Sequence, residues 1–321
     1  MFPFPSSLSP AQLEAHKLLA HLLATLKDPE STYYPRYGHW IVRHAALEEF
    51  LFRCVRPDVW KYLSSNRNFD SMKLIRGDLK FEGRAVYLDG ILGTDKNVRV
   101  YVGQSNNLRF RVGQHLNFRY RRDNPSLHYH AMLYSIYNVF SILAILPPPN
   151  KENQSLPGMD CPDLLLNVLE MWMCLIFRTL PDETLEKWFP EHVKVETPGR
   201  AGMLNIATPI DQGGRAKEWP DLKMVDDPLV QEYLANERRR NHVGYARAED
   251  MERIAAERKS EQPEEKKVPE RKIPTQPAEI QPSYLDLNGF AISPATLVFM
   301  GISVVLGVAL LRNGSRPHLR K

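Results

Sequence analysis

One stretch near the C-terminal end limits the fold of this chain more than any other. Residues 289–311, GFAISPATLVFMGISVVLGVALL, run for 23 residues without a charged side chain. A helix of that length crosses a hydrocarbon core of about 30 Å, and the run has no amphipathic face that would suit the surface of a soluble domain. We therefore expect a transmembrane helix over 289–311. A buried helix of a soluble domain is the alternative.

The residues that flank this run predict its orientation. Only ten residues follow it, RNGSRPHLRK, and four of them are Arg or Lys. A single span so close to the end implies insertion after synthesis, so we expect a C-terminal anchor in the lipid bilayer with the bulk of the chain in the cytosol. The basic tail favours the mitochondrial outer membrane, and the endoplasmic reticulum is the alternative.

The rest of the chain divides by composition into three segments. Residues 1–80 are rich in leucine and aromatic residues and predict a helical extension, which begins where Ser9, Pro10 and Gln12 form a capping box. Residues 81–210 mix short β-branched runs with helical periods, which predicts a small α+β domain with a short antiparallel sheet flanked by helices. Residues 211–288 are polar and proline-rich, which indicates a charged helix and a disordered linker.

Charge and cysteine usage exclude some classes of protein. The net charge of +4 is small for 321 residues, so any nucleic-acid signal must be local. The three cysteines, Cys54, Cys161 and Cys174, stand far apart without a Cys-x-x-Cys pair. This spacing argues against a disulfide framework and against a structural zinc site.

Two β-branched runs, AVYLDG at 85–90 and NVRVYVGQS at 97–105, each alternate between two faces of a strand. Side chains of a strand alternate between its faces, so the valines at 98, 100 and 102 share one face and Arg99 and Tyr101 take the other. In the first run Tyr87 lies opposite Val86. A hairpin that turns over 93–97 would carry both tyrosines on the face away from the aliphatic core, although strands often contain aromatic residues for packing alone.

The segment 99–122 carries six arginines and no acidic residue. In the helix after the second strand, a buried stripe is expected to include Leu108, Val112 and Leu116, with Arg111 and His115 at its edge. Four more arginines would surround that edge, and grouped guanidinium groups favour phosphate partners: Arg109, Arg119, Arg121 and Arg122. A solvated basic helix face is the alternative.

Glu170 stands inside the apolar segment LLLNVLEMWMCLIF. A carboxylate in so apolar a helix must be paired, protonated or bound to a cation, because burying it alone costs several kcal/mol. Pairing with an arginine and a helix end close to solvent are the plainer explanations.

Taken in order, these residues resemble the GIY-YIG endonuclease family over about 84–208. Ala85-Val86-Tyr87 stands for the first tripeptide, with Ala in place of Gly, and Tyr101-Val102-Gly103 for the second. SNNLRFRVGQH resembles the helix that follows in the family, with Arg111 as its arginine. The later positions that match are the metal-binding Glu170, Asn205 in GMLNIATP, and His128 in NPSLHYHAM, for which His130 is a competitor.

The resemblance implies a metal-dependent endonuclease that hydrolyses phosphodiester bonds in DNA or RNA. It implies Glu170 as the ligand of Mg²⁺ or Mn²⁺, Arg111 as a donor to the phosphate, and Tyr87 as the group that orients or deprotonates water, with its pKa lowered by arginines and metal. Tyr101, His128 and Asn205 would complete the catalytic set. An inactive adaptor on the same fold and a membrane-anchored scaffold without a site are the alternatives.

Overall fold

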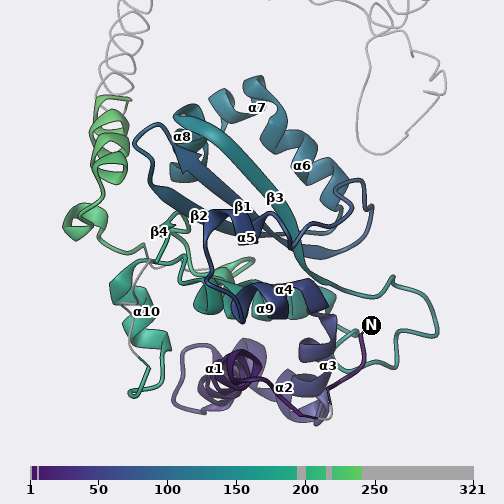
Figure 1. The fold of residues 1–321 in the computed structure, drawn as a ribbon. Coiled ribbons are helices and arrows are strands. Elements are labelled where there is room, and N and C mark those ends of the chain that lie inside the picture. The colour runs from purple at the N-terminus through teal and green to yellow at the C-terminus, as the bar shows by residue number, and fades with distance from the viewer. Residues whose placement is uncertain (1, 6, 194–199, 215–218, 241–321) are drawn as a thin grey trace, which may run out of the picture. The chain divides into compact units, whose positions relative to one another are not determined.

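The computed structural model describes residues 2–5, 7–193, 200–214 and 219–240. These residues belong to one compact unit, in which helices lie on both faces of a small sheet (Figure 1). The expected span over 289–311 and the linker beyond residue 240 lie outside the described residues. The α+β class is confirmed.

The N-terminal segment is helical, as its leucines predict. The capping box of Ser9 and Gln12 begins the first helix, with each residue accepting from the other's backbone N–H. The helices of this segment are α1 (Pro10–Lys27), a π-helical turn η1 (Tyr34–Gly38), α2 (His39–Arg43), α3 (Leu47–Cys54), α4 (Pro57–Leu63) and α5 (Phe69–Met72).

Within the described ranges, the sheet has four strands in the order β3-β1-β2-β4: β1 (Ala85–Gly93), β2 (Val98–Ser105), β3 (Ser135–Ile145) and β4 (Gly202–Met203). The hairpin of β1 and β2 forms as expected, and β3 also pairs with β1 antiparallel. The short β4 pairs with β2 in parallel. The sheet is therefore mixed, and the expectation of an antiparallel sheet is wrong at this edge, because the chain passes through two further helices before β4 returns beside β2.

Three short helices follow β2, and the longest helix of the expected domain follows β3. The first three are α6 (Leu108–Leu116), α7 (Phe118–Asp123) and α8 (Leu127–Leu133). After β3 come α9 (Pro162–Phe177), α10 (Asp182–Trp188), the 3-10 turns η2 (Pro209–Asp211) and η3 (Leu222–Met224), and a helix over 228–240.

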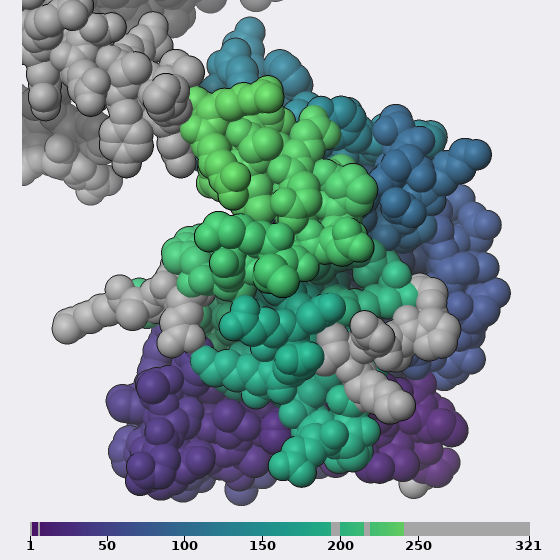
Figure 2. Space-filling view, turned by 90° about the vertical axis from the view of Figure 1, so that its left-hand side faces the viewer, coloured from purple at the N-terminus to yellow at the C-terminus, as the bar shows by residue number. Residues whose placement is uncertain are grey.

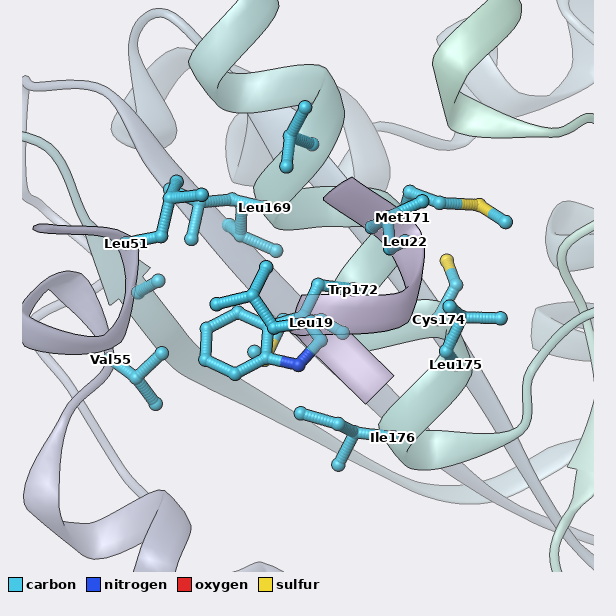
Figure 3. Packing of buried hydrophobic residues seen from close by; sticks show 14 of the residues in the cluster. Leu19, Leu22, Leu51, Val55, Leu169, Met171, Trp172, Cys174, Leu175 and Ile176 are labelled. Atoms are coloured by element: carbon cyan, nitrogen blue, oxygen red, sulfur yellow. The ribbon is translucent and has the colours of Figure 1, made fainter. Parts of the chain in front are cut away.

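Helix α9 is the centre of the main hydrophobic core. It packs between the sheet and the N-terminal helices, and Figure 3 shows Trp172 close to Leu19 of α1, with Leu51 and Val55 beside them. The indole N–H of Trp172 donates to the backbone oxygen of Ala15 at 2.8 Å. One side of α9 thus packs against the N-terminal helices, and the opposite side packs against the sheet.

A second, smaller core lies at the other end of the sheet. Leu229, Val230 and Tyr233 of the last helix pack there against Ile91 and Leu127. Figure 2 shows this helix, in bright green, lying against the segments that carry the sheet and α6–α8. Residues that follow the expected domain therefore help to build its surface.

Within the described residues, no single helix has the length and composition that a membrane span needs. Helices α9 and α10 pass the test only as a pair, and the chain bends by 113° between them.

Candidate active site

Both tyrosines lie on the face predicted for them. Val86, Val100 and Val102 pack into the core that contains α9, whereas Tyr87 and Tyr101 pack with Leu108 on the opposite face. Tyr87 lies opposite Gly103 in the register of β1 and β2. A Cβ atom at Gly103 would come within 2.5 Å of the Tyr87 hydroxyl, so the glycine of the second tripeptide makes room for the tyrosine of the first.

The Tyr87 hydroxyl joins two residues of α6. It lies 2.6 Å from Nε2 of His115, and Nε of Arg111 donates to it at 3.3 Å. Arg111 also donates from Nη1 to the side-chain oxygen of Gln114 at 3.0 Å. Tyr87 and Arg111, which are 24 positions apart, therefore share one polar cluster at the sheet surface.

His115 is fully buried, and the expectation that it lies at the edge of the α6 stripe is wrong. The inward positions are Leu108, Val112 and His115, while Leu116 is 62% exposed. Positions i, i+4 and i+7 share a face of a helix as readily as i, i+4 and i+8. The Tyr87 hydroxyl gives the imidazole a hydrogen bond, which allows it to take the buried position.

Burial shifts the pKa values of this cluster toward the neutral forms. Desolvation lowers the pKa of His115 to about 2. It raises the pKa of Tyr87 well above its ordinary value, and Arg111 offsets this only in part. The direction is opposite to the lowered pKa expected from the sequence, so in this state Tyr87 is a neutral hydroxyl that accepts from Arg111 and shares a hydrogen bond with His115.

Tyr101 and His128 are stacked beside this cluster. Their ring centroids are 4.0 Å apart with planes 5° from parallel. Nε2 of His128 lies 2.8 Å from the carboxylate of Asp89, which also accepts from the amide of Asn138. Burial raises the pKa of Asp89 to about 8 and lowers that of His128 to about 3, so both neutral forms are favoured. The competitor of His128, His130, lies away from this group, against Tyr233.

Glu170 is 3% exposed, on the turn of α9 that faces the edge of β2. Nε2 of Gln212 donates to its Oε2 at 2.6 Å, and the amide of Gln104 in turn donates to the oxygen of Gln212 at 2.8 Å. Desolvation raises the pKa of Glu170 to about 8, partly offset by the hydrogen bond from Gln212 and the charge of Arg111. The carboxyl group of Glu170 is thus bonded to an amide. The ion pair with an arginine that the sequence offered as the plainer explanation is not formed among the described residues.

The described residues offer a hard divalent cation one carboxylate, Glu170, so water and substrate would supply most of its ligands. The raised pKa marks a carboxylate whose charge lacks a cationic partner in contact, and the amide of Gln212 presents its N–H group to it while the amide oxygen accepts from Gln104. Among the described residues, no three His, Cys, Asp or Glu side chains gather closely enough to hold a metal ion by themselves.

Asn205 braces the edge of β2 beyond the point where β4 ends. Its side-chain oxygen accepts from the backbone N–H of Val102 at 2.9 Å, and its amide donates to the backbone oxygen of Val102 at 2.7 Å. The side chain thus replaces a strand residue at this edge.

Apart from Arg111, the arginines of segment 99–122 differ in their burial and in their partners. Arg99 is buried and pairs with Asp95 and Asp227, so it belongs to no phosphate-binding surface. Arg109 and Arg122 are exposed and pair with Glu82 and Asp123, respectively.

The other two outer arginines differ from this pattern. Arg119 is exposed, and Arg121 is half-buried and donates to the backbone oxygen of His115. Only part of the predicted basic surface therefore lies beside the tyrosines.

A cleft of about 680 Å³ opens on this cluster. Tyr101, Arg111, His115 and His128 line one wall, and the segments that carry Leu204 and Leu222 line the other. Neither Glu170 nor Gln212, which donates to its carboxyl group, lines this cleft. Gln212 lines a separate cleft together with Gln104 and Asn167.

Three residues of the site were missed from the sequence. Asp89 carried a usable signal, because a carboxylate in the strand segment YLDGILG needs a buried partner as much as Glu170 does. Gln104 and Gln212 carried none, since an amide has no charge that burial would make unusual.

We compared the chain with protein-family models, with curated proteins and with solved structures, and none of the three comparisons found a match. The resemblance to the GIY-YIG family therefore depends on the residues and their arrangement alone.

Proposed function

We propose that this chain is a metal-dependent endonuclease that hydrolyses phosphodiester bonds in nucleic acid. The observation that carries the proposal is the convergence of Tyr101, Arg111 and His128 on one cleft. Tyr87 is buried behind them and bonded to Arg111, and the buried Glu170, whose pKa is raised to about 8, lies within reach of the Arg111 charge. The membrane anchor at 289–311 is part of the same proposal and would hold the enzyme at a bilayer.

Each side chain has a role in this proposal that its contacts support. Arg111 is fixed by the Tyr87 hydroxyl and Gln114, so its remaining N–H groups are already in place for a phosphate oxygen. Tyr87 is buried, and its hydroxyl holds Arg111 in place from behind the cleft. Tyr101 and His128 form the wall that positions the substrate, and Asn205 keeps the edge of β2 in register.

The cation fits at Glu170. When bound, it would supply the positive charge that stabilises the leaving oxygen. To hold it, Glu170 would release its proton to solvent and exchange the hydrogen bond from Gln212 for the cation.

One observation favours a second candidate, an inactive adaptor on the same fold. Gln212 is itself held by Gln104 and by Asn167, which donates to its backbone oxygen at 3.1 Å. If this network never opens, Glu170 cannot reach a cation and the cleft can only bind.

A cleavage assay on the full chain in mild detergent, with fluorescent DNA and RNA substrates and Mg²⁺ or Mn²⁺, tests the proposal. We expect cleavage with metal and none in EDTA. Glu170→Gln is expected to abolish cleavage and leave nucleic-acid binding intact, and Arg111→Ala to slow cleavage by roughly a hundredfold, the scale for removing one preorganised donor.

The control is Glu152→Gln, which changes an exposed glutamate by the same atoms. If Glu170→Gln and Glu152→Gln cut at the rate of the parent, the activity belongs elsewhere. If the parent binds nucleic acid and never cuts it, the adaptor takes the place of the nuclease.

A further inference from the structure

A second cleft, of about 460 Å³, lies next to the one that contains the site. Its walls come from α7, α8 and the helix over 228–240. The two clefts share Pro125, Ser126, Tyr129 and Tyr233 as lining residues, so they are neighbouring parts of one surface.

The charge of this second cleft is of one sign. Among the described residues, its lining includes Arg121, Arg122, Arg239 and Arg240, and no acidic side chain. Three described acidic groups lie close by, outside the lining. Asp123 pairs with Arg122, Glu232 accepts from the Tyr134 hydroxyl, and the charge of Glu237 acts on Tyr233. The surplus of guanidinium groups suits a polyanion with spaced phosphates.

Aromatic rings lie between these charges. Phe118 is 60% exposed and Tyr134 is 38% exposed, both at the lining of the cleft. The guanidinium of Arg240 lies over the ring of Tyr233, 6.0 Å from its centroid. Exposed rings interleaved with arginines are what single-stranded nucleic acid needs, since bases stack on the rings and phosphates bind the cations.

Three buried polar atoms at the lining of this cleft add a separate observation. The Tyr129 hydroxyl, Nε2 of His130 and Nε of Arg121 have no hydrogen-bond partner among the described residues. His130 is 9% exposed, and its nearest carboxylate, that of Glu232, is 4.0 Å away. Buried polar groups are rarely left without a partner, so a polar ligand is expected here.

We infer that this second cleft binds the unpaired nucleotides of single-stranded nucleic acid next to the scissile bond. The inference rests on the proposed function, because the strand it holds is the one that the neighbouring site would cut. Arg121 connects the two clefts, since it lines the second and donates to the backbone oxygen of His115 at the first. The substrate class is therefore one with a single-stranded arm, not a continuous duplex.

Binding in EDTA tests the inference without cleavage. We would use the full chain in mild detergent and a short fluorescein-labelled oligothymidylate, with a duplex of the same length for comparison. Arg239→Ser combined with Arg240→Ser is expected to weaken oligothymidylate binding on the order of tenfold and to reduce its salt dependence. Phe118→Ala is expected to weaken it by roughly five- to a hundredfold, and Phe118→Trp to restore it.

Two matched controls separate the cleft from general effects. Lys17→Ser with Lys27→Ser removes the same charge from α1, and Phe110→Ala removes a ring of similar exposure from α6. Both controls are expected to bind oligothymidylate like the parent. The inference is wrong if the cleft variants also bind like the parent, if the controls lose as much, or if the duplex binds as tightly as the single strand.

A lipid surface is the other polyanion that such a cleft could meet. Vesicles with anionic headgroups form a further arm, and the inference is overturned if the cleft variants lose vesicle binding while oligothymidylate binding is unchanged. The cleavage assay keeps this result apart from the proposed function. If the parent cleaves nucleic acid and the cleft variants bind oligothymidylate as the parent does, the cleft inference is rejected and the nuclease proposal stands. If the cleft variants lose binding and the parent never cleaves, the nuclease proposal is rejected and the chain is a single-strand binding module.

Discussion

The buried carboxyl group of Glu170 has a property that can be measured without a substrate. Its carboxyl group accepts from Gln212, and burial still raises its pKa to about 8. A carboxyl group that is neutral in the folded chain and ionised in the unfolded chain makes stability depend on pH, which gives a test independent of catalysis.

We expect Glu170→Gln to stabilise the chain in EDTA at pH 9 more than at pH 5. The folded-state pKa of about 8 lies above the ordinary value of 4.5, so the folded chain binds more protons between these values. The contribution of Glu170 is fully present below pH 4.5 and is lost as pH rises through about 8. Glutamine does not titrate, so the variant keeps its stability as the pH rises. Urea unfolding midpoints at both pH values measure the difference.

Glu152→Gln again provides the control, because it changes an exposed side chain. An equal gain at pH 5 and pH 9 from Glu170→Gln would show that the carboxyl group is not neutral in the folded chain, and would remove the raised pKa from the argument.

Arg99 links the hairpin of β1 and β2 to the start of the helix over 228–240. Arg99 is 1% exposed and donates from Nε and Nη2 to both carboxylate oxygens of Asp227, at 2.8 and 2.7 Å. Its Nη1 and Nη2 also donate to Asp95 in the hairpin turn. Asp227 accepts from the backbone N–H of Leu229 as well, so this contact fixes the start of the helix over 228–240.

Arg99→Met is expected to cost about 2–3 kcal/mol of unfolding free energy. This is somewhat below the usual loss for a broken buried ion pair, because the two carboxylates, Asp95 and Asp227, are partly exposed. Arg109→Met, which breaks the exposed pair with Glu82, should cost no more than about 0.5 kcal/mol. Urea denaturation of both variants provides the measurement. Equal losses would mean that the last helix does not depend on Arg99.

The whole described unit depends on α9, which carries Glu170 and also fills the core. Its indole at Trp172 bonds to α1, and the Tyr37 hydroxyl of the N-terminal segment donates to the backbone oxygen of Ile210 at 2.8 Å. Arg36 donates to the backbone oxygen of Gln212 at 2.6 Å. The N-terminal helices therefore support both the core and the turn that lies against Glu170.

We expect a chain that lacks residues 1–75 to lose cooperative unfolding. Without α1–α5, the buried face of α9 around Leu169 and Trp172 would be exposed to water, at about 25 cal/mol for each Å² of apolar surface. Near-ultraviolet circular dichroism during a thermal melt measures the loss. A shortened chain that melts cooperatively at the temperature of the parent would show that residues 81–210 fold without the extension.

The sequence by itself determined the features that depend on short-range periodicity. Alternation along β1 and β2 placed both tyrosines on one face, the capping box began α1, and the charge of Glu170 within an apolar helix marked an unusual site. These features follow from spacings of two to four residues, which fix the direction of a side chain relative to its own element.

Only the tertiary structure decided which groups meet. The small rotation of α6 that buries His115 and exposes Leu116 is set by packing against the sheet, because both positions fit a helical stripe equally well. Gln212 reaches Glu170 across 42 positions, and Asp227 reaches Arg99 across 128. The packing of the elements determines which of these distant residues meet. A local sequence pattern does not predict contacts between residues so far apart in the chain.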